Sequence, residues 1–261
     1  MPTKNTPLSW IIVIFSTLFL MTELAYAAPI TSLDDAINKA GRQRMLTQRI
    51  TKSYFLIGQD VAVDSALSQL DGAVALFEEQ LLELEEFSPN GDIAQALATV
   101  RASWQTFRTD ALSTPEKDQA LLFLSTANDL LARCEIVVGL LEAEAKTQKG
   151  KIINISGRQR MLSQRIAMLY AAHAWGVGND NTASALQTAV AEFDTALATL
   201  QGSGINTPDI QKALKKVNAQ WRFSRSGFAL MDSDQYVPHV IHVTTESILK
   251  KMDRITGMYS Q

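Results

Sequence analysis

Residues 41–50 read GRQRMLTQRI, and residues 157–166 read GRQRMLSQRI, so nine of ten positions are identical at an offset of 116. The likeness continues through three further pairs of segments, whose offset drifts only from 116 to 118. The paired segments are 68–84 with 184–200, 93–108 with 210–225, and 126–139 with 244–257. Collinear blocks with so little slippage indicate a tandem duplication of one structural unit.

Ala, Leu, Gln and Glu dominate the long segments, and strand-like alternation is rare, so the sequence predicts an all-α fold. Each copy divides into four helical stretches separated by Gly, Pro, Asn and Asp. The expected helices are 32–58, 61–87, 91–111 and 116–150 in the first copy, and 150–176, 180–201, 207–230 and 234–259 in the second. Short connections favour antiparallel neighbours, and therefore two tandem antiparallel four-helix bundles. We place copy 1 at 28–148 and copy 2 at 149–261.

The alignment also pairs Phe77 with Phe193 and Trp104 with Trp221. Large aromatic side chains at matched positions are expected in the cores of both copies. Between the copies, the stretch from about 116 to 176 contains no proline. One long helix, straight or kinked, is therefore one way in which the two bundles are joined.

The first 27 residues have the form of a secretory signal peptide. Lys4 supplies a positive charge, Trp10 to Met21 is apolar, and Ala25-Tyr26-Ala27 has the small-x-small form of a cleavage site. We expect the mature chain to begin at Ala28 in the periplasm, the alternative being an uncleaved N-terminal anchor. No later segment reaches the roughly 18 apolar residues of a membrane helix.

The net charge of −3 and the export signal disfavour nucleic-acid binding, and the single cysteine excludes an intramolecular disulfide. The chain has no Ser/His/Asp pattern, no phosphate loop and no Cys/His cluster, so we expect neither an enzyme nor a cofactor. His239 and His242 are spaced as in some metal sites, but no Glu-x-x-His motif accompanies them. We therefore expect no metal.

The repeated motif has two distinct faces when it is placed on a helix. One face carries a glycine, an arginine, a methionine and a glutamine: Gly41, Arg44, Met45 and Gln48, repeated as Gly157, Arg160, Met161 and Gln164. Leu46, Ile50 and Ile57 lie nearly opposite and form the natural core stripe of their own bundle. Arg44 and Arg160 are therefore expected to point away from the core of their own copy.

The motif segments are also locally cationic. Residues 39–59 contain five cations and residues 146–179 contain six, and neither stretch contains a carboxylate. Surface helices usually intersperse the two signs, so these arginines lack partners on their own helix. A planar guanidinium suits a planar oxyanion, and the glycine three residues earlier leaves room for one.

Pairing with an acid from another helix is the ordinary role of such arginines. We favour that role for Arg42 and Arg49. For Arg44 and Arg160 we favour a binding role, because both copies repeat the whole Gly–Arg–Gln stripe.

INKAGRQRM at 37–45 and INISGRQRM at 153–161 resemble the P-box of the PilJ-type sensor domain. That domain is the N-terminal module of type IV pilus chemotransducers and is related to the periplasmic domain of the NarX and NarQ nitrate sensors. The resemblance implies that a glycine and an arginine from each of two P-box helices clamp one nitrate or nitrite. Carried over, these are Gly41, Arg44, Gly157 and Arg160, with Gln48, Gln164, Arg42 and Arg158 as possible supporting residues.

The resemblance further implies that the tandem copies supply both halves of such a site, and that a membrane signalling protein is a partner. The leading hypothesis is a periplasmic sensor or binding protein for a small oxyanion. The alternative is a ligand-free helical module that docks on a pilus, envelope or receptor component.

Overall fold

The computed structural model describes residues 29–228 and 237–261, and over these residues it is all helical, without strands. The helices of copy 1 are α1 (Leu33–Gly58), α2 (Val63–Phe87), α3 (Gly91–Ala111), the short η1 (Lys117–Gln119) and α4 (Ala120–Ala145). Those of copy 2 are α5 (Gln148–Ala174), α6 (Asp180–Gln201), α7 (Pro208–Phe228) and α8 (Pro238–Ser260). The predicted fold of two antiparallel four-helix bundles is confirmed.

Side chains that cap backbone N–H groups set several of the helix starts. Ser32, Asn90 and Asn179 accept hydrogen bonds from the first turns of α1, α3 and α6. Such caps satisfy amide groups that have no partner within the helix. The predicted break near Asp232 lies outside the described residues.

The two copies are not joined by one long helix, so that expectation is wrong. α4 ends at Ala145, Lys146 adopts a left-handed conformation with φ 53°, and the Thr147 hydroxyl caps α5 by accepting from the Gly150 amide. A left-handed residue followed by a threonine cap stops one helix and starts the next without proline. The chain therefore reverses direction here.

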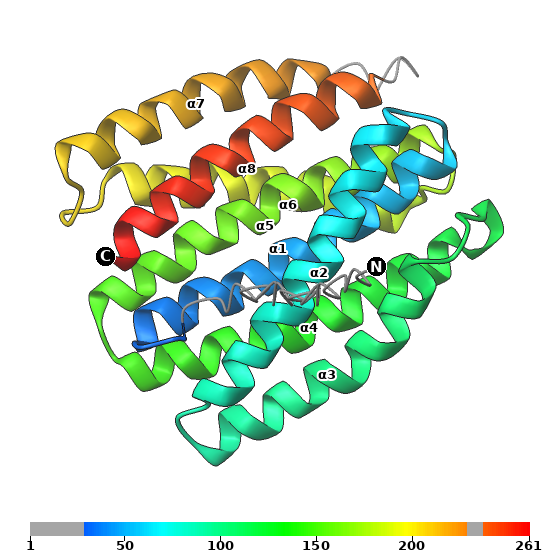
Figure 1. The fold of residues 1–261 in the computed structure, drawn as a ribbon. Helices are drawn as coiled ribbons and strands as arrows, with labels where there is room; N and C mark the ends of the chain where they lie inside the picture. The colour runs from blue at the N-terminus through cyan, green and yellow to red at the C-terminus, as the bar shows by residue number, and fades with distance from the viewer. Residues whose placement is uncertain (1–28, 229–236) are drawn as a thin grey trace, which may run out of the picture.

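This reversal places α1 and α5 side by side and parallel at the centre of the molecule (Figure 1). Near their N-terminal ends, Gly150 lies against Ile37. At their C-terminal ends, the Gln59 side chain donates to the Ala171 carbonyl oxygen over 3.2 Å. Helices α3 and α7 lie at opposite edges (Figure 1), so the two copies pack side by side, related by a pseudo-two-fold axis.

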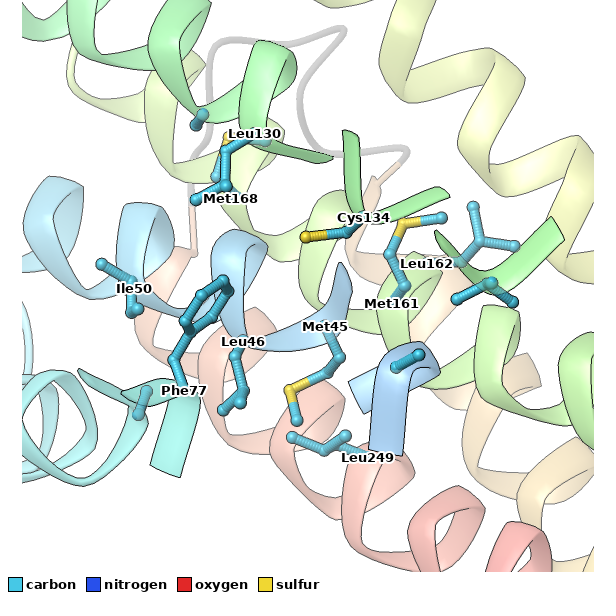
Figure 2. Close-up of a cluster of buried hydrophobic side chains, with 14 of the residues drawn as sticks. Met45, Leu46, Ile50, Phe77, Leu130, Cys134, Met161, Leu162, Met168 and Leu249 are labelled. Atoms are coloured by element: carbon cyan, nitrogen blue, oxygen red, sulfur yellow. The ribbon is translucent and has the colours of Figure 1, made fainter. Parts of the chain in front are cut away.

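The buried apolar side chains of both copies belong largely to one continuous core. Figure 2 shows part of it, with Met45 and Leu46 of α1, Cys134 of α4 and Met161 of α5 close together. Because α1 and α5 pack against each other and against their own bundles, both are buried on nearly all sides. Polar motif side chains on these helices are consequently buried too.

The aligned aromatic residues occupy equivalent buried places, as predicted. Phe77 stacks on Trp104 with ring centroids 3.9 Å apart, and Phe193 packs on Trp221 at 4.1 Å. All four side chains are at most 2% exposed. They fix the outer helix pairs of each copy in the same way.

The proposed signal peptide at 1–27 and the cleavage point before Ala28 lie outside the described residues. Within the described part of the chain, none of the helices combines the length and the apolar character needed to span a bilayer.

Candidate anion-binding site

The two motifs meet face to face across the pseudo-two-fold axis. A Cβ atom added to Gly41 would stand 3.8 Å from the Gly157 Cα, and the reverse holds for Gly157. The same Cβ positions lie 3.3–3.4 Å from the Nη2 atoms of both Arg44 and Arg160. The structure therefore brings together all four residues that the sequence singled out, and the two guanidinium groups lie near each other beside the glycine pair.

Arg44 is fully buried and reaches three groups. Its Nη1 donates to Glu135 Oε2 of α4 over 2.7 Å, and its Nη2 donates to Asn154 Oδ1 of α5 over 2.8 Å. A longer contact of 3.4 Å joins Nη2 to the Asn154 carbonyl oxygen. Arg44 thus connects its own copy to the other.

Arg160 repeats this arrangement on the other side of the axis. It is also fully buried, its Nη1 donates to Asp253 Oδ1 of α8 over 2.6 Å, and its Nη2 donates to the Asn38 carbonyl oxygen of α1 over 2.8 Å. Asn38 aligns with Asn154 and Glu135 with Asp253 in the duplication. The two halves of the site are therefore equivalent in sequence and similar in geometry, except that Arg44 bonds to the Asn154 side chain and Arg160 to the Asn38 carbonyl oxygen.

Acids from other helices supply partners that the motif segments themselves lack. The expected pairing of Arg42 and Arg49 is confirmed, since they contact Asp253 and Glu246. Arg44 and Arg160 are also paired with acids from other helices, so they too have the ordinary role that we did not favour for them. The motif segments alone do not predict these acidic partners, because the acids come from α4 and α8, about 90 residues further along the chain.

The ion pairs around the axis join more arginines than acids, and a further carboxylate, Glu142, accepts from the Asn154 side chain. Each bridging acid joins arginines from both copies: Glu135 contacts Arg44 and Arg158, and Asp253 contacts Arg160 and Arg42. Arg158 also contacts Glu192. Four guanidinium groups therefore share three carboxylates in this cluster.

Burial makes these cations costly to keep charged. Burial lowers the pKa of Arg44, an effect that Glu135 opposes. Burial, together with the positive charges of Arg42 and Arg44, lowers the pKa of Arg160 to about 10 in spite of Asp253. Each charged guanidinium is therefore less favourably placed than an arginine in water.

Several buried polar atoms here have no hydrogen-bond partner among the described residues: Arg44 Nε, Arg160 Nε and Asn38 Oδ1. Buried donors without partners are unusual in native proteins and call for a reason. Two of the three are on the arginines that the sequence predicts to bind an anion.

The possible supporting residues divide into two groups. Arg42 and Arg158 form ion pairs with Asp253 and Glu135. These are the acids that also hold Arg160 and Arg44. The side-chain oxygens of Gln48 and Gln164 are engaged elsewhere, by Arg165 and by Lys52. Neither glutamine contacts the arginine pair in this structure.

Sequence reasoning did not assign roles to Asn38, Asn154, Glu135 and Asp253. A signal was available, because the asparagines are shared by both motifs and an acid stands at the same place in the fourth aligned block. Gln43 and Gln159 have a different role, since each donates to the carbonyl oxygen of a core phenylalanine. Those bonds tie α1 to α2 and α5 to α6.

No group of three or more His, Cys, Asp or Glu side chains is placed to hold a metal ion within 29–228 and 237–261. His242 of α8 contacts Ser65 and Gln69 instead.

A family model described as the N-terminal domain of the type IV pili methyl-accepting chemotaxis transducer, PilJ, matches the chain twice, at residues 31–129 and 144–240. The chain belongs to the PilJ family. Both matches contain the repeated motif, which confirms the tandem duplicate of a PilJ sensor-type domain. No curated protein and no solved structure shows a significant match to the chain.

Proposed function

We propose that this tandem PilJ protein is a periplasmic sensor for a small monovalent oxyanion, nitrate or nitrite, held between Arg44 and Arg160. The observation that carries the proposal is the convergence of both Nη2 atoms on the Gly41–Gly157 contact. Each Nη1 is held by an acid, so each Nη2 lies on the side of the guanidinium nearest the other copy.

Charge balance supports a monoanion. Among the groups joined by ion pairs, the arginines exceed the acids by one, and the full burial of Arg44 and Arg160 strengthens their interactions with charges. A nitrate or nitrite would neutralise that charge and accept N–H bonds from both copies. A dianion would reverse the excess.

The geometry also supports a signalling role. An anion that accepts from both Nη2 atoms competes with the Asn154 side chain and the Asn38 carbonyl oxygen, which now link the two helices. Exchanging these contacts would alter how α1 and α5 pack. Because α1 and α5 form the central contact between the copies, a change in their hydrogen bonds would alter the packing of both bundles.

The experiment is a melting series of the purified protein with nitrate, nitrite and chloride at matched ionic strength. Nitrate or nitrite should raise the melting temperature at concentrations at which chloride does not, because a ligand that binds only the folded state stabilises it by mass action. A flat oxyanion accepts paired N–H bonds, whereas a spherical ion cannot.

Arg44→Lys and Arg160→Lys should each lose the shift, since an ammonium keeps the charge but lacks the planar fork. The matched control is Arg108→Lys, which changes a half-exposed pair between Arg108 of α3 and Glu78 of α2 and should keep the shift. An unchanged shift in the double Arg44/Arg160 variant would refute the site.

The second candidate is a ligand-free interaction module. One observation favours it, namely that Glu135 and Asp253 already serve Arg44 and Arg160 as internal partners. A folded wild-type protein that shows no shift with any small oxyanion would make this the better description.

Periplasmic export is part of the proposal and rests on the N-terminal sequence alone. N-terminal sequencing of protein from the native envelope should give Ala28 as the first residue. Recovery of an intact N-terminus in the membrane fraction would instead favour an anchor.

A further inference from the structure

A second feature of the molecule adjoins the central arginine–carboxylate cluster, with which it shares Glu135 and Arg158. A groove of about 560 Å³ runs between α4, α5 and α6, where copy 1 meets copy 2. Each of the three helices contributes an apolar side chain to its lining, Leu131, Met161 and Ala185, and polar side chains such as Asn128 and Asn181 line it too. This volume and this mixed lining are typical of sites for small organic molecules.

Arg165 of α5 lines the groove and has no carboxylate partner. Its Nη1 donates to two neutral amide oxygens, Gln48 Oε1 at 3.1 Å and Asn128 Oδ1 at 2.9 Å. No carboxylate within the described residues comes within ion-pair distance of it, and its Nε and Nη2 donate to no group there. Burial lowers the pKa of Arg165, an effect that the nearby charge of Glu192 opposes.

In copy 1, the arginine that corresponds to Arg165 has an acidic partner within the protein. Arg49, which aligns with Arg165, donates to Glu246 Oε2 over 2.7 Å. Glu246 aligns with Asn128, so the carboxylate on one side of the molecule is an amide on the other. The duplicates are thus equivalent at the central site but different here.

The space beside Arg49 is also filled. Lys52, fully buried, bonds to Glu246, Gln69 and Gln164. On the groove side, the residues aligned with Lys52 and Gln69 are Met168 and Ala185. Loss of the acid, the lysine and a glutamine leaves Arg165 beside an open groove.

We propose that the groove between α4, α5 and α6 binds a small organic monocarboxylate, whose carboxylate group contacts Arg165 as Glu246 contacts Arg49 in the other copy. Arg165 has two free donor atoms, Nε and Nη2, for paired bonds to a carboxylate, and Asn128 supplies an amide beside it. The apolar lining residues Leu131, Met161 and Ala185 contact the hydrocarbon part of the ligand.

Other charges in the groove select for a single negative charge. Glu135 and Glu192 line the same groove, and both are bonded to Arg158. A second carboxylate on the ligand would meet these acids rather than a free cation. Dicarboxylates and phosphates are therefore disfavoured relative to monocarboxylates.

The test is calorimetric titration of the full mature protein with butyrate and benzoate, with succinate as the dianionic comparison. Butyrate or benzoate should bind saturably, and succinate should bind more weakly. Asn128→Glu restores the acid found in the other copy and should weaken binding by about tenfold or more, because an internal carboxylate then occupies Arg165. Arg165→Gln should do the same by removing the donor.

Arg225→Gln alters an exposed pair with Asp194, and neither residue lines the groove, so this variant is the matched control and should bind like wild type. Asn128→Glu should also keep any response to nitrate, which separates this groove from the central arginine pair. Absence of butyrate and benzoate binding in wild type, or wild-type affinity in both groove variants, would overturn the proposal.

Discussion

Gly41 and Gly157 stand against each other across the pseudo-two-fold axis, so close that a Cβ on either would be 3.8 Å from the other's Cα. Glycine inside a helix costs about 1 kcal/mol relative to alanine, and both helices bear that cost at the same place. The contact lets α1 and α5 approach closely and lets the Nη2 groups of Arg44 and Arg160 lie against the glycine backbone.

Alanine at either glycine should disturb the arginine pair more than it disturbs the fold. The new Cβ would lie 3.3–3.4 Å from both Nη2 atoms, which are the ends of flexible side chains and can shift by a few tenths of an ångström. Gly41→Ala and Gly157→Ala should therefore fold, yet lose the nitrate-dependent rise in melting temperature. Gly139→Ala in α4, where nothing lies within 4 Å, is the control and should be stabilising by up to about 1 kcal/mol.

The two buried tryptophans offer a matched pair. Trp104→Ala and Trp221→Ala should each lower the free energy of unfolding by roughly 3–5 kcal/mol, as measured by urea denaturation. Substitution by phenylalanine should distinguish the two sites, because Trp221 Nε1 donates to Asp194 over 2.7 Å whereas Trp104 Nε1 is buried without a hydrogen-bond partner. Trp221→Phe should cost about 1 kcal/mol more than Trp104→Phe, and the opposite order would contradict these environments.

Replacing both members of the buried Lys52–Glu246 pair should cost little stability, whereas replacing Glu246 alone should cost much. Burial lowers the pKa of Lys52 to about 8, an effect that Glu246 opposes. Glu246→Asn alone leaves Lys52 and Arg49 without their carboxylate and should destabilise by about 3–5 kcal/mol.

Adding Lys52→Met copies the residues of the other side, Asn128 and Met168, and should recover most of that loss. A double-mutant cycle on the free energy of unfolding measures the coupling. Additive effects would show that the pair does not act as a unit.

Acidification should weaken the fold through His242. Burial, reinforced by the charge of Lys52, lowers the pKa of this imidazole from 6.5 to about 4. Between those values the unfolded chain binds a proton that the folded chain does not, so stability falls as the pH drops through that window.

His242→Gln should flatten the dependence of the free energy of unfolding on pH between about 6.5 and 4. The exposed neighbour His239, changed to glutamine, serves as the control. Equal slopes in wild type and His242→Gln would exclude this origin.

Local signals in the sequence were enough to predict most of the fold. Hydrophobic periodicity and cap residues located the helices to within a few residues, and the duplication paired Trp104 with Trp221. The break at Lys146 was predicted a few residues late, near 150, with one long helix left open as an alternative, because a left-handed lysine has no proline or glycine to mark it. Only the folded chain shows that this break makes α1 and α5 parallel.

The central residues of the site were predictable from the sequence, whereas their acidic partners and the neighbouring groove were not. A repeated glycine and arginine at helical spacing identified Gly41, Arg44, Gly157 and Arg160, which the structure brings together. Their acidic partners depend on how α4 and α8 pack, which local pattern does not determine. The groove beside Arg165 lies where the residues of the two copies differ. Aligning the copies by their shared residues does not reveal such positions.

The turn at Lys146–Thr147 also affects how the response depends on the amount of protein. Because one covalent chain supplies both motif helices, α1 and α5 meet without an association step. In a pair of separate subunits, dilution would separate the two arginines and weaken the site by mass action. Here the midpoint of an anion titration should be the same at nanomolar and micromolar protein, so a cell that makes few copies of this protein would read the same anion concentration as a cell that makes many.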